Sequence, residues 1–274
     1  MSDPRSTPIP SDHTGEWDDA RPPESGRALA RAALYSIVSL AFRAPSEAFC
    51  APLFSRAGHE VVLDAAQTAG GEPLARCAAD LFRDLPPVSE LAARYRGFFG
   101  HTARSDAPPY ETEYGDDDLF QQPQELADLA GFAEAFGVRL RPDAGERVDH
   151  VSCECEFLAF LASKEAYAIE NGDAEMFAAT LDAQALFLRD HLARFVPAFA
   201  HRLERAEAGG FYARLGRLLL ALVTADCERL RVPLGTEQLR IRMPLATALP
   251  IGCGSCSELV PGGGEPDDAA MESA

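Results

Sequence analysis

Apolar residues recur every three or four positions along most of the chain, which is the spacing of one buried face of an α-helix. In residues 25–43 this face consists of Leu29, Ala33, Ile37, Leu40 and Ala41. The same spacing returns in residues 72–85, 88–100, 124–137, 149–171, 173–195 and 210–230. Alternating strand patterns bounded by hairpin turns are absent. The pattern predicts an all-α fold, a single-domain bundle of about eight to ten helices.

Residues that start or stop helices lie at the edges of these segments. Ser25 and Asp149 precede apolar runs and are expected to act as N-caps. Gly137 closes residues 124–137, as a C-cap glycine does. Pro197, just beyond Phe195, is expected to break or kink the helix of residues 173–195.

The acidic charge is concentrated in three segments. The chain carries a net charge of −18, of which −4 falls in residues 1–25, −7 in Tyr110–Asp128 and −5 in residues 252–274. Such a balance argues against a nucleic-acid-binding surface. The central acidic segment suits a basic partner, because opposite charge speeds and orients encounter. Its alternative role is to keep the protein soluble.

Composition also predicts the organisation of the chain. We expect a disordered acidic tail over residues 1–24, a helical domain over 25–243 and a flexible tail over 244–274. The N-terminus lacks the apolar core of a secretory signal. The longest aliphatic run, Leu218–Val223, is far shorter than the ~20 residues of a membrane span. We therefore expect a cytoplasmic protein without a membrane span.

Two long loops interrupt the helical pattern, at residues 102–123 and 137–150. Long loops within a helical domain are usually functional or disordered. The first contains Tyr110, Tyr114 and Phe120, residue types that disordered linkers avoid. We expect this loop to be ordered and exposed to a partner.

His150, Cys153 and Cys155 follow the second loop and resemble the start of a metal site. On a helix the two cysteines point about 200° apart, so they cannot grip one ion. Cys155 falls on the apolar face and is best explained as a small buried hydrophobe. Asp149 and His150 remain as a polar pair that suits a cationic or peptide ligand. An N-cap followed by an exposed histidine is the plainer alternative.

A second thiol pair, Cys253 and Cys256, forms a CxxC near the C-terminus. A lone CxxC is half of a zinc or iron–sulfur site, or a redox pair. No second CxxC, nucleophile elbow, P-loop, dinucleotide fingerprint or HExxH accompanies it. We therefore expect no metal, no other cofactor and no enzymatic activity, with these cysteines as the remaining metal candidates.

Five motifs follow one another along the chain: PPYETEYG, LADLAGFAEAFGV, RVDHVSCECEFLAFLASKEAYA, FLRDHLARFVPAFAHRLERA and GGFYARLGRLLLALV. Their order resembles the TorD/DmsD/NarJ family of molybdoenzyme chaperones. The resemblance spans roughly residues 26–232. Phe195 stands where the family often has tryptophan, which preserves an apolar anchor.

The resemblance implies a helical cytoplasmic chaperone without a catalytic site. Its partner would be the precursor of a molybdopterin-containing oxidoreductase subunit, bound through its twin-arginine signal peptide or N-terminal region until the cofactor is inserted. The suggested peptide-binding region comprises Tyr110, Glu111, Tyr114, Asp149 and His150.

Two other functions stay open on the sequence. One is a metal- or redox-linked assembly factor that uses Cys253 and Cys256. The other is a structural subunit of an oxidoreductase complex. A monomer and a homodimer are both compatible with the sequence.

Overall fold

A computed structural model describes residues 24–99, 105–116, 121–139 and 146–242. This part of the chain is helical and has no strand, which confirms the predicted all-α class. The helices are α1 (Glu24–Ala41), α2 (Glu47–Leu53), α3 (Arg56–Leu81), α4 (Val88–Phe99), α5 (Gln121–Ala135), α6 (Val151–Asn171), α7 (Ala174–Phe187), α8 (Ala193–Ala206) and α9 (Phe211–Leu230). The predicted tails and the Cys253–Cys256 pair lie outside the described residues.

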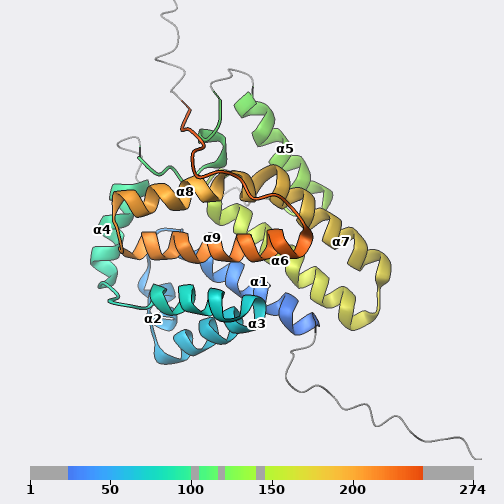
Figure 1. The fold of residues 1–274 in the computed structure, drawn as a ribbon, viewed down its shortest axis with the longest axis horizontal. Coiled ribbons are helices and arrows are strands. Elements are labelled where there is room, and N and C mark those ends of the chain that lie inside the picture. Colours follow the sequence, from blue (N-terminus) through green and yellow to red (C-terminus); the bar gives the residue numbers. More distant parts are fainter. Residues whose placement is uncertain (1–23, 100–104, 117–120, 140–145, 243–274) are drawn as a thin grey trace, which may run out of the picture.

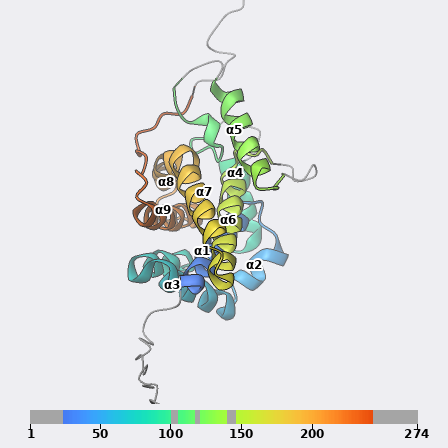
Figure 2. The same ribbon diagram turned by 90° about the vertical axis from the view of Figure 1, so that its right-hand side faces the viewer.

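The core forms around α1, which packs along α6 and also contacts α3 and α9. Its buried side chains include Leu34, Tyr35 and Val38. α8 pairs with α9, and α5 lies at the end of the molecule opposite α3 (Figures 1 and 2). The apolar face predicted for residues 25–43 is wrong, because Leu29 and Leu40 are 48% and 42% exposed and α1 buries the neighbouring face instead.

Local signals explain most helix boundaries. Ser46, Ser55 and Asp173 cap α2, α3 and α7 by accepting hydrogen bonds from backbone N–H groups three residues on. Gly137, two residues after α5, has a φ of 72°, as predicted for a residue at a helix end. Ser25 is not an N-cap, because α1 is already helical at Glu24.

Of the two predicted effects of Pro197, a break or a kink, the break does not occur. A π-helical turn, Leu188–Leu192, joins α7 to α8, and α8 runs through Pro197 to Ala206. Proline has no N–H, so the carbonyl of Ala193 lacks its usual helical donor. Gly235 N–H donates to that carbonyl at 3.0 Å. A Cβ on Gly235 would lie 2.8 Å from the same oxygen, so only glycine allows this approach.

Candidate functional site

The first long loop returns to the start of α6. Tyr110 pairs with His150 as an isolated antiparallel bridge, and Glu111 N–H donates to the Asp149 carbonyl at 2.9 Å. Val151 N–H donates to the Pro109 carbonyl at 2.8 Å. These bonds join Tyr110–Tyr114 to Glu146–His150, two segments that we call the loop corner. All five residues of the predicted peptide-binding region lie in it.

Asp149 is the ionic centre of the loop corner. Its fully buried carboxylate accepts hydrogen bonds from Thr112 Oγ1 at 2.7 Å and from Arg147 Nη2 at 2.6 Å and Nε at 3.0 Å. A buried carboxylate needs such partners, because desolvation otherwise penalises its charge. The prediction that Asp149 caps α6 is wrong, since its side chain turns towards the loop instead.

His150 caps α6 in its place. Its Nδ1 accepts a hydrogen bond from Ser152 N–H at 3.1 Å and lies 2.7 Å from Ser152 Oγ. The ring is buried and meets Tyr110 edge to face at 5.2 Å. Burial, together with the positive charges of Arg43 and Arg147, lowers its pKa to about 3. His150 is therefore neutral near pH 7, with its proton on Nε2.

Glu111 and Tyr114 anchor the loop on α8. The carboxylate of Glu111 is fully buried; it accepts from Arg194 Nη2 at 2.7 Å and lies 3.2 Å from His191 Nδ1. The ring of Tyr114 packs on Phe195 at 5.4 Å, and its hydroxyl donates to the Pro108 carbonyl. Phe195 is thus the apolar anchor that its place in the motif indicates.

The loop is ordered in its described part, residues 105–116, but it is not exposed as predicted. Glu111, Thr112 and Tyr114 are all buried. Their side chains bond to and pack against distant parts of the chain, and sequence spacing does not reveal such contacts. The described part of the loop is therefore packed into the domain.

The segment after α9 also packs against this loop. Arg242 binds Glu125 of α5 through both terminal nitrogens, at 2.8 and 2.9 Å, and donates to the Thr112 carbonyl at 2.9 Å. Tyr114 forms an isolated bridge with Ile241. Sequence reasoning missed Arg242 and also Arg147 and Arg194, because no local motif distinguishes them from surface arginines.

A few groups of the loop corner remain accessible. Tyr110 is half-buried, and its hydroxyl donates to Glu146 Oε2 at 3.2 Å. The guanidinium of Arg147 lies 4.6 Å from the centre of the Tyr110 ring. The side chains of Glu113 and Glu146 are 28% and 23% exposed. The accessible part thus contains an aromatic ring, the carboxylates of Glu113 and Glu146, and the Arg147 side chain, which is 41% exposed.

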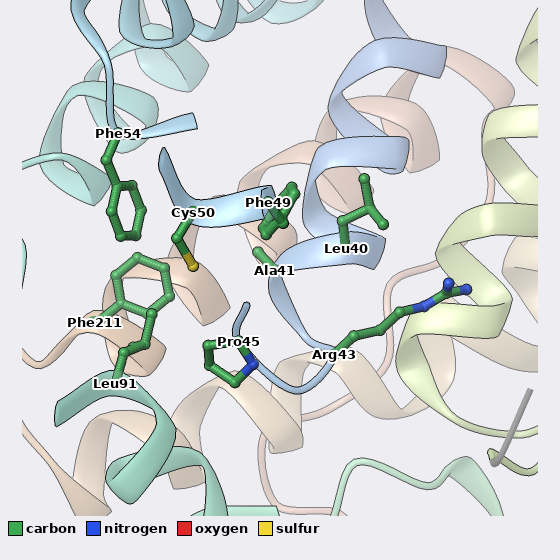
Figure 3. Close-up of a pocket in the computed structure, with 9 residues that line it drawn as sticks. All are labelled: Leu40, Ala41, Arg43, Pro45, Phe49, Cys50, Phe54, Leu91 and Phe211. Carbon is green, nitrogen blue, oxygen red and sulfur yellow. The ribbon is translucent and has the colours of Figure 1, made fainter. Parts of the chain in front are cut away.

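A small apolar pocket lies near the loop corner. Figure 3 shows it between the end of α1, α2, α4 and the start of α9, with Cys50 Sγ pointing inward and Arg43 at one side. Its lining residues are Leu40, Ala41, Arg43, Pro45, Phe49, Cys50, Phe54, Leu91 and Phe211. Arg43 pairs with Glu156 of α6 and is close enough to His150 to lower its pKa. Arg43 therefore links the pocket to the loop corner.

The cysteine cluster of the sequence does not form a metal site. Within the described ranges no three His, Cys, Asp or Glu side chains gather in a way that could hold an ion. Cys155 is fully buried in the core, as predicted. Burial raises the pKa of the Cys153 thiol to about 11, so it stays protonated.

None of the described helices is long and apolar enough to cross a bilayer.

Comparison with known proteins gives consistent matches. Residues 63–201 match the family described as "Nitrate reductase delta subunit". The chaperone protein TorD of Vibrio cholerae is 34% identical over 139 residues, which are 50% of this chain and 60% of that protein. The chlorate reductase assembly chaperone of Ideonella dechloratans is 42% identical over 106 residues, 38% of this chain and 52% of that protein.

The selenate reductase assembly chaperone of Thauera selenatis is 41% identical over 106 residues, again 38% of this chain and 52% of that protein. The matched stretches thus span less than two thirds of these relatives. Their names describe chaperones and not catalysts. The family match covers the whole loop corner.

Proposed function

The chain belongs to the nitrate reductase delta subunit family, and we propose that it is an assembly chaperone for a reductase. The family match confirms the resemblance seen in its motifs. Its client would be the molybdopterin-containing catalytic subunit, bound in the cytoplasm through a twin-arginine leader before cofactor insertion and export. The relatives named for chlorate and selenate reductase assembly support a reductase as partner. The observation that carries the proposal is the loop corner beside an apolar pocket.

The accessible part of the loop corner suits the charged end of such a leader. Glu113 and Glu146 flank Tyr110 and keep about a quarter of their side-chain surface in solvent. Carboxylates bind guanidinium groups through two parallel hydrogen bonds, and this geometry favours arginine over lysine. A pair of arginines in the leader would bind here, one at each carboxylate, and the arginine at Glu113 would replace Arg147, whose Nη1 lies 4.0 Å from that carboxylate.

The pocket suits the apolar stretch that follows the arginines. Leu40 at its rim is 42% exposed, and Phe49 and Pro45 are half-buried. The hollow measures only about 10 Å³, so a peptide would lie across it and insert single side chains. An amphipathic segment that places apolar anchors in a row of such hollows is a common mode of peptide recognition.

The buried residues of the loop corner would act by positioning. Glu111, Asp149, Tyr114 and His150 are each at most 1% exposed, so a peptide on this folded surface would not touch them. They hold Tyr110 between its two carboxylates. Of the predicted peptide-binding residues, Tyr110 alone would then contact the leader directly.

Calorimetric titration with a synthetic twin-arginine leader tests the proposal. The wild type is expected to bind, and the double variant Glu113→Gln/Glu146→Gln should bind at least about tenfold more weakly, since two charge-assisted contacts are lost. The matched control is Glu60→Gln/Glu204→Gln, which removes two exposed carboxylates elsewhere. Absence of binding by the wild type, or equal losses in both double variants, would contradict the proposal.

A further inference from the structure

A second, polar cleft lies between the end of α3, α4 and the α8–α9 turn. It has a volume of about 310 Å³ and shares only Phe211 with the lining of the apolar pocket. Asp84, Arg94, Glu207, Gly209, Gly210 and Arg214 line it. Its charged lining consists of two arginines and two carboxylates, beside the glycine turn between α8 and α9.

The first turn of α9 opens into this cleft. Gly210 is the N-cap of this 20-residue helix and has no side chain to accept a hydrogen bond from the first N–H groups. Such N–H groups and the helix dipole together attract negative charge. A helix N-terminus alone does not make a binding site, so the neighbouring side chains must also favour an anion.

Arg214 supplies an independent indication. Its side chain lines the cleft although the residue is only 7% exposed. One terminal nitrogen donates to the Gly209 carbonyl, whereas Nε has no hydrogen-bond partner among the described residues. Burial lowers its pKa, and the charges of Arg217 and Arg83 lower it further, against the opposing effect of Asp84. A buried guanidinium with a spare donor calls for an anion.

The chain's own Glu207 stands at the position such an anion would take. One of its oxygens pairs with Arg94, and the other is buried without a hydrogen-bond partner in the described part of the chain. A Cβ on Gly210 would collide with this carboxylate, which therefore lies directly against the start of α9. The acid is held at one oxygen only, so a better acceptor can replace it.

We propose that this cleft is an oxyanion site, and that it takes the phosphate group of a small phosphorylated molecule or free phosphate in exchange for the Glu207 carboxylate. Phosphate offers more acceptor oxygens and charge than a carboxylate, which matches the combined donors of Arg94, Arg214 and the first turn of α9. The arginines of this site are not among the residues proposed to bind the leader.

The test is titration of the full chain with inorganic phosphate at constant ionic strength, followed by nuclear magnetic resonance of the backbone amides. The wild type is expected to show saturable shifts at Gly209–Tyr212. Glu207→Gln should tighten binding roughly tenfold, because the competing charge is gone, and Arg94→Gln should weaken it by a similar factor. A parallel titration with a phosphate monoester separates free phosphate from a phosphorylated molecule.

Arg217→Gln is the matched control, because it removes the same charge from α9 but does not line the cleft. It should leave phosphate affinity within about twofold of the wild type. Saturable shifts that respond equally to Arg94→Gln and Arg217→Gln would overturn the site in favour of general charge attraction. Absence of saturation in both the wild type and Glu207→Gln would overturn it outright.

Discussion

Two clusters of buried ion pairs lie in this molecule and serve different ends. In the first, the helix cluster, Arg31 of α1 and Arg229 of α9 bind Glu165 of α6 and Asp226 of α9. The second is the loop corner, where Asp149 binds Arg147, and Glu111 binds Arg194 of α8. The carboxylates of both clusters are at least nine-tenths buried.

The difference lies in what each cluster holds. The helix cluster joins residues of three helices, and Tyr35 and Gln184 complete it with hydrogen bonds to Asp226 and Glu165. It fixes how the bundle packs. The loop corner holds segments without regular structure beside partly exposed groups. The same chemistry therefore stabilises the domain in one place and shapes a surface in the other.

Removing an acid from the helix cluster should have the largest effect. Asp226→Ala leaves the buried Tyr35 hydroxyl without its acceptor and removes one of the two carboxylates that Arg31 pairs with, and breaking a buried pair costs about 3–5 kcal/mol. We expect the free energy of unfolding, measured by urea denaturation, to fall by that amount. The control Glu60→Ala breaks an exposed pair with Arg56 and should cost at most about 1 kcal/mol. Equal losses would contradict the contrast.

Asp149→Asn should act more locally. The amide keeps the shape and the contact with Thr112 but loses the charge that Arg147 pairs with, so we expect a loss of about 1–3 kcal/mol. Hydrogen exchange should accelerate in residues 110–114 and 146–150 but not in α1 or α9. Uniform acceleration throughout the bundle would show that the loop corner also holds the core together.

Gly235→Ala should destabilise the segment after α9, which packs against the loop corner. The added methyl group would clash with the carbonyls of Ala193 and Arg194, and the bond to Ala193 would be lost. We expect a loss of about 1–3 kcal/mol in urea denaturation. Gly131→Ala is the control, because a Cβ there meets nothing within 4 Å. A stability of Gly235→Ala equal to that of the control would contradict the packing described here.

Two buried groups should give opposite pH dependences. Burial holds the pKa of His150 at about 3, below its usual 6.5, so the unfolded chain binds the extra proton and stability falls as pH drops from 6.5 towards 3. Burial raises the pKa of Glu154, helped by the negative charges of Glu111 and Asp149, so stability falls as pH rises above 4.5. Each slope is at most about 1.4 kcal/mol per pH unit.

Urea denaturation over a series of pH values separates the two groups. His150→Gln should flatten the decline on the acid side, and Glu154→Gln should flatten the decline on the alkaline side. A variant that shifts the whole curve without changing its slope would show that its residue does not titrate in this way.

The sequence predicted the helices better than their surroundings. The helical spacing and Gly137 depend on near neighbours, and the structure confirms the helices and the turn at Gly137 but not the buried face predicted for residues 25–43. Pro197 does not break its helix, since Gly235 N–H donates to the Ala193 carbonyl that proline leaves without a donor. No local pattern connects Gly235 to this carbonyl. Residues 56–70 were not predicted to be helical but form the first part of α3, and Gly71, with a φ of 67°, separates them from the predicted residues 72–85.

The loop corner shows the same limit. Resemblance to a family named its five residues, and the structure brings them together. Their burial was not predictable, because Glu111 meets Arg194 and Thr112 meets Arg242 only after the whole chain has folded. Asp149 turned away from its expected cap for the same reason.

The most direct test of the central claim is amide hydrogen exchange of the full chain with and without a twin-arginine leader. If the loop corner and the pocket form the peptide surface, the leader will slow exchange at Tyr110–Tyr114, at residues 146–153 and at the end of α1 with α2. It will leave α7 unchanged. Protection confined to α7 or to the start of α9, with none at the loop corner, would contradict the account.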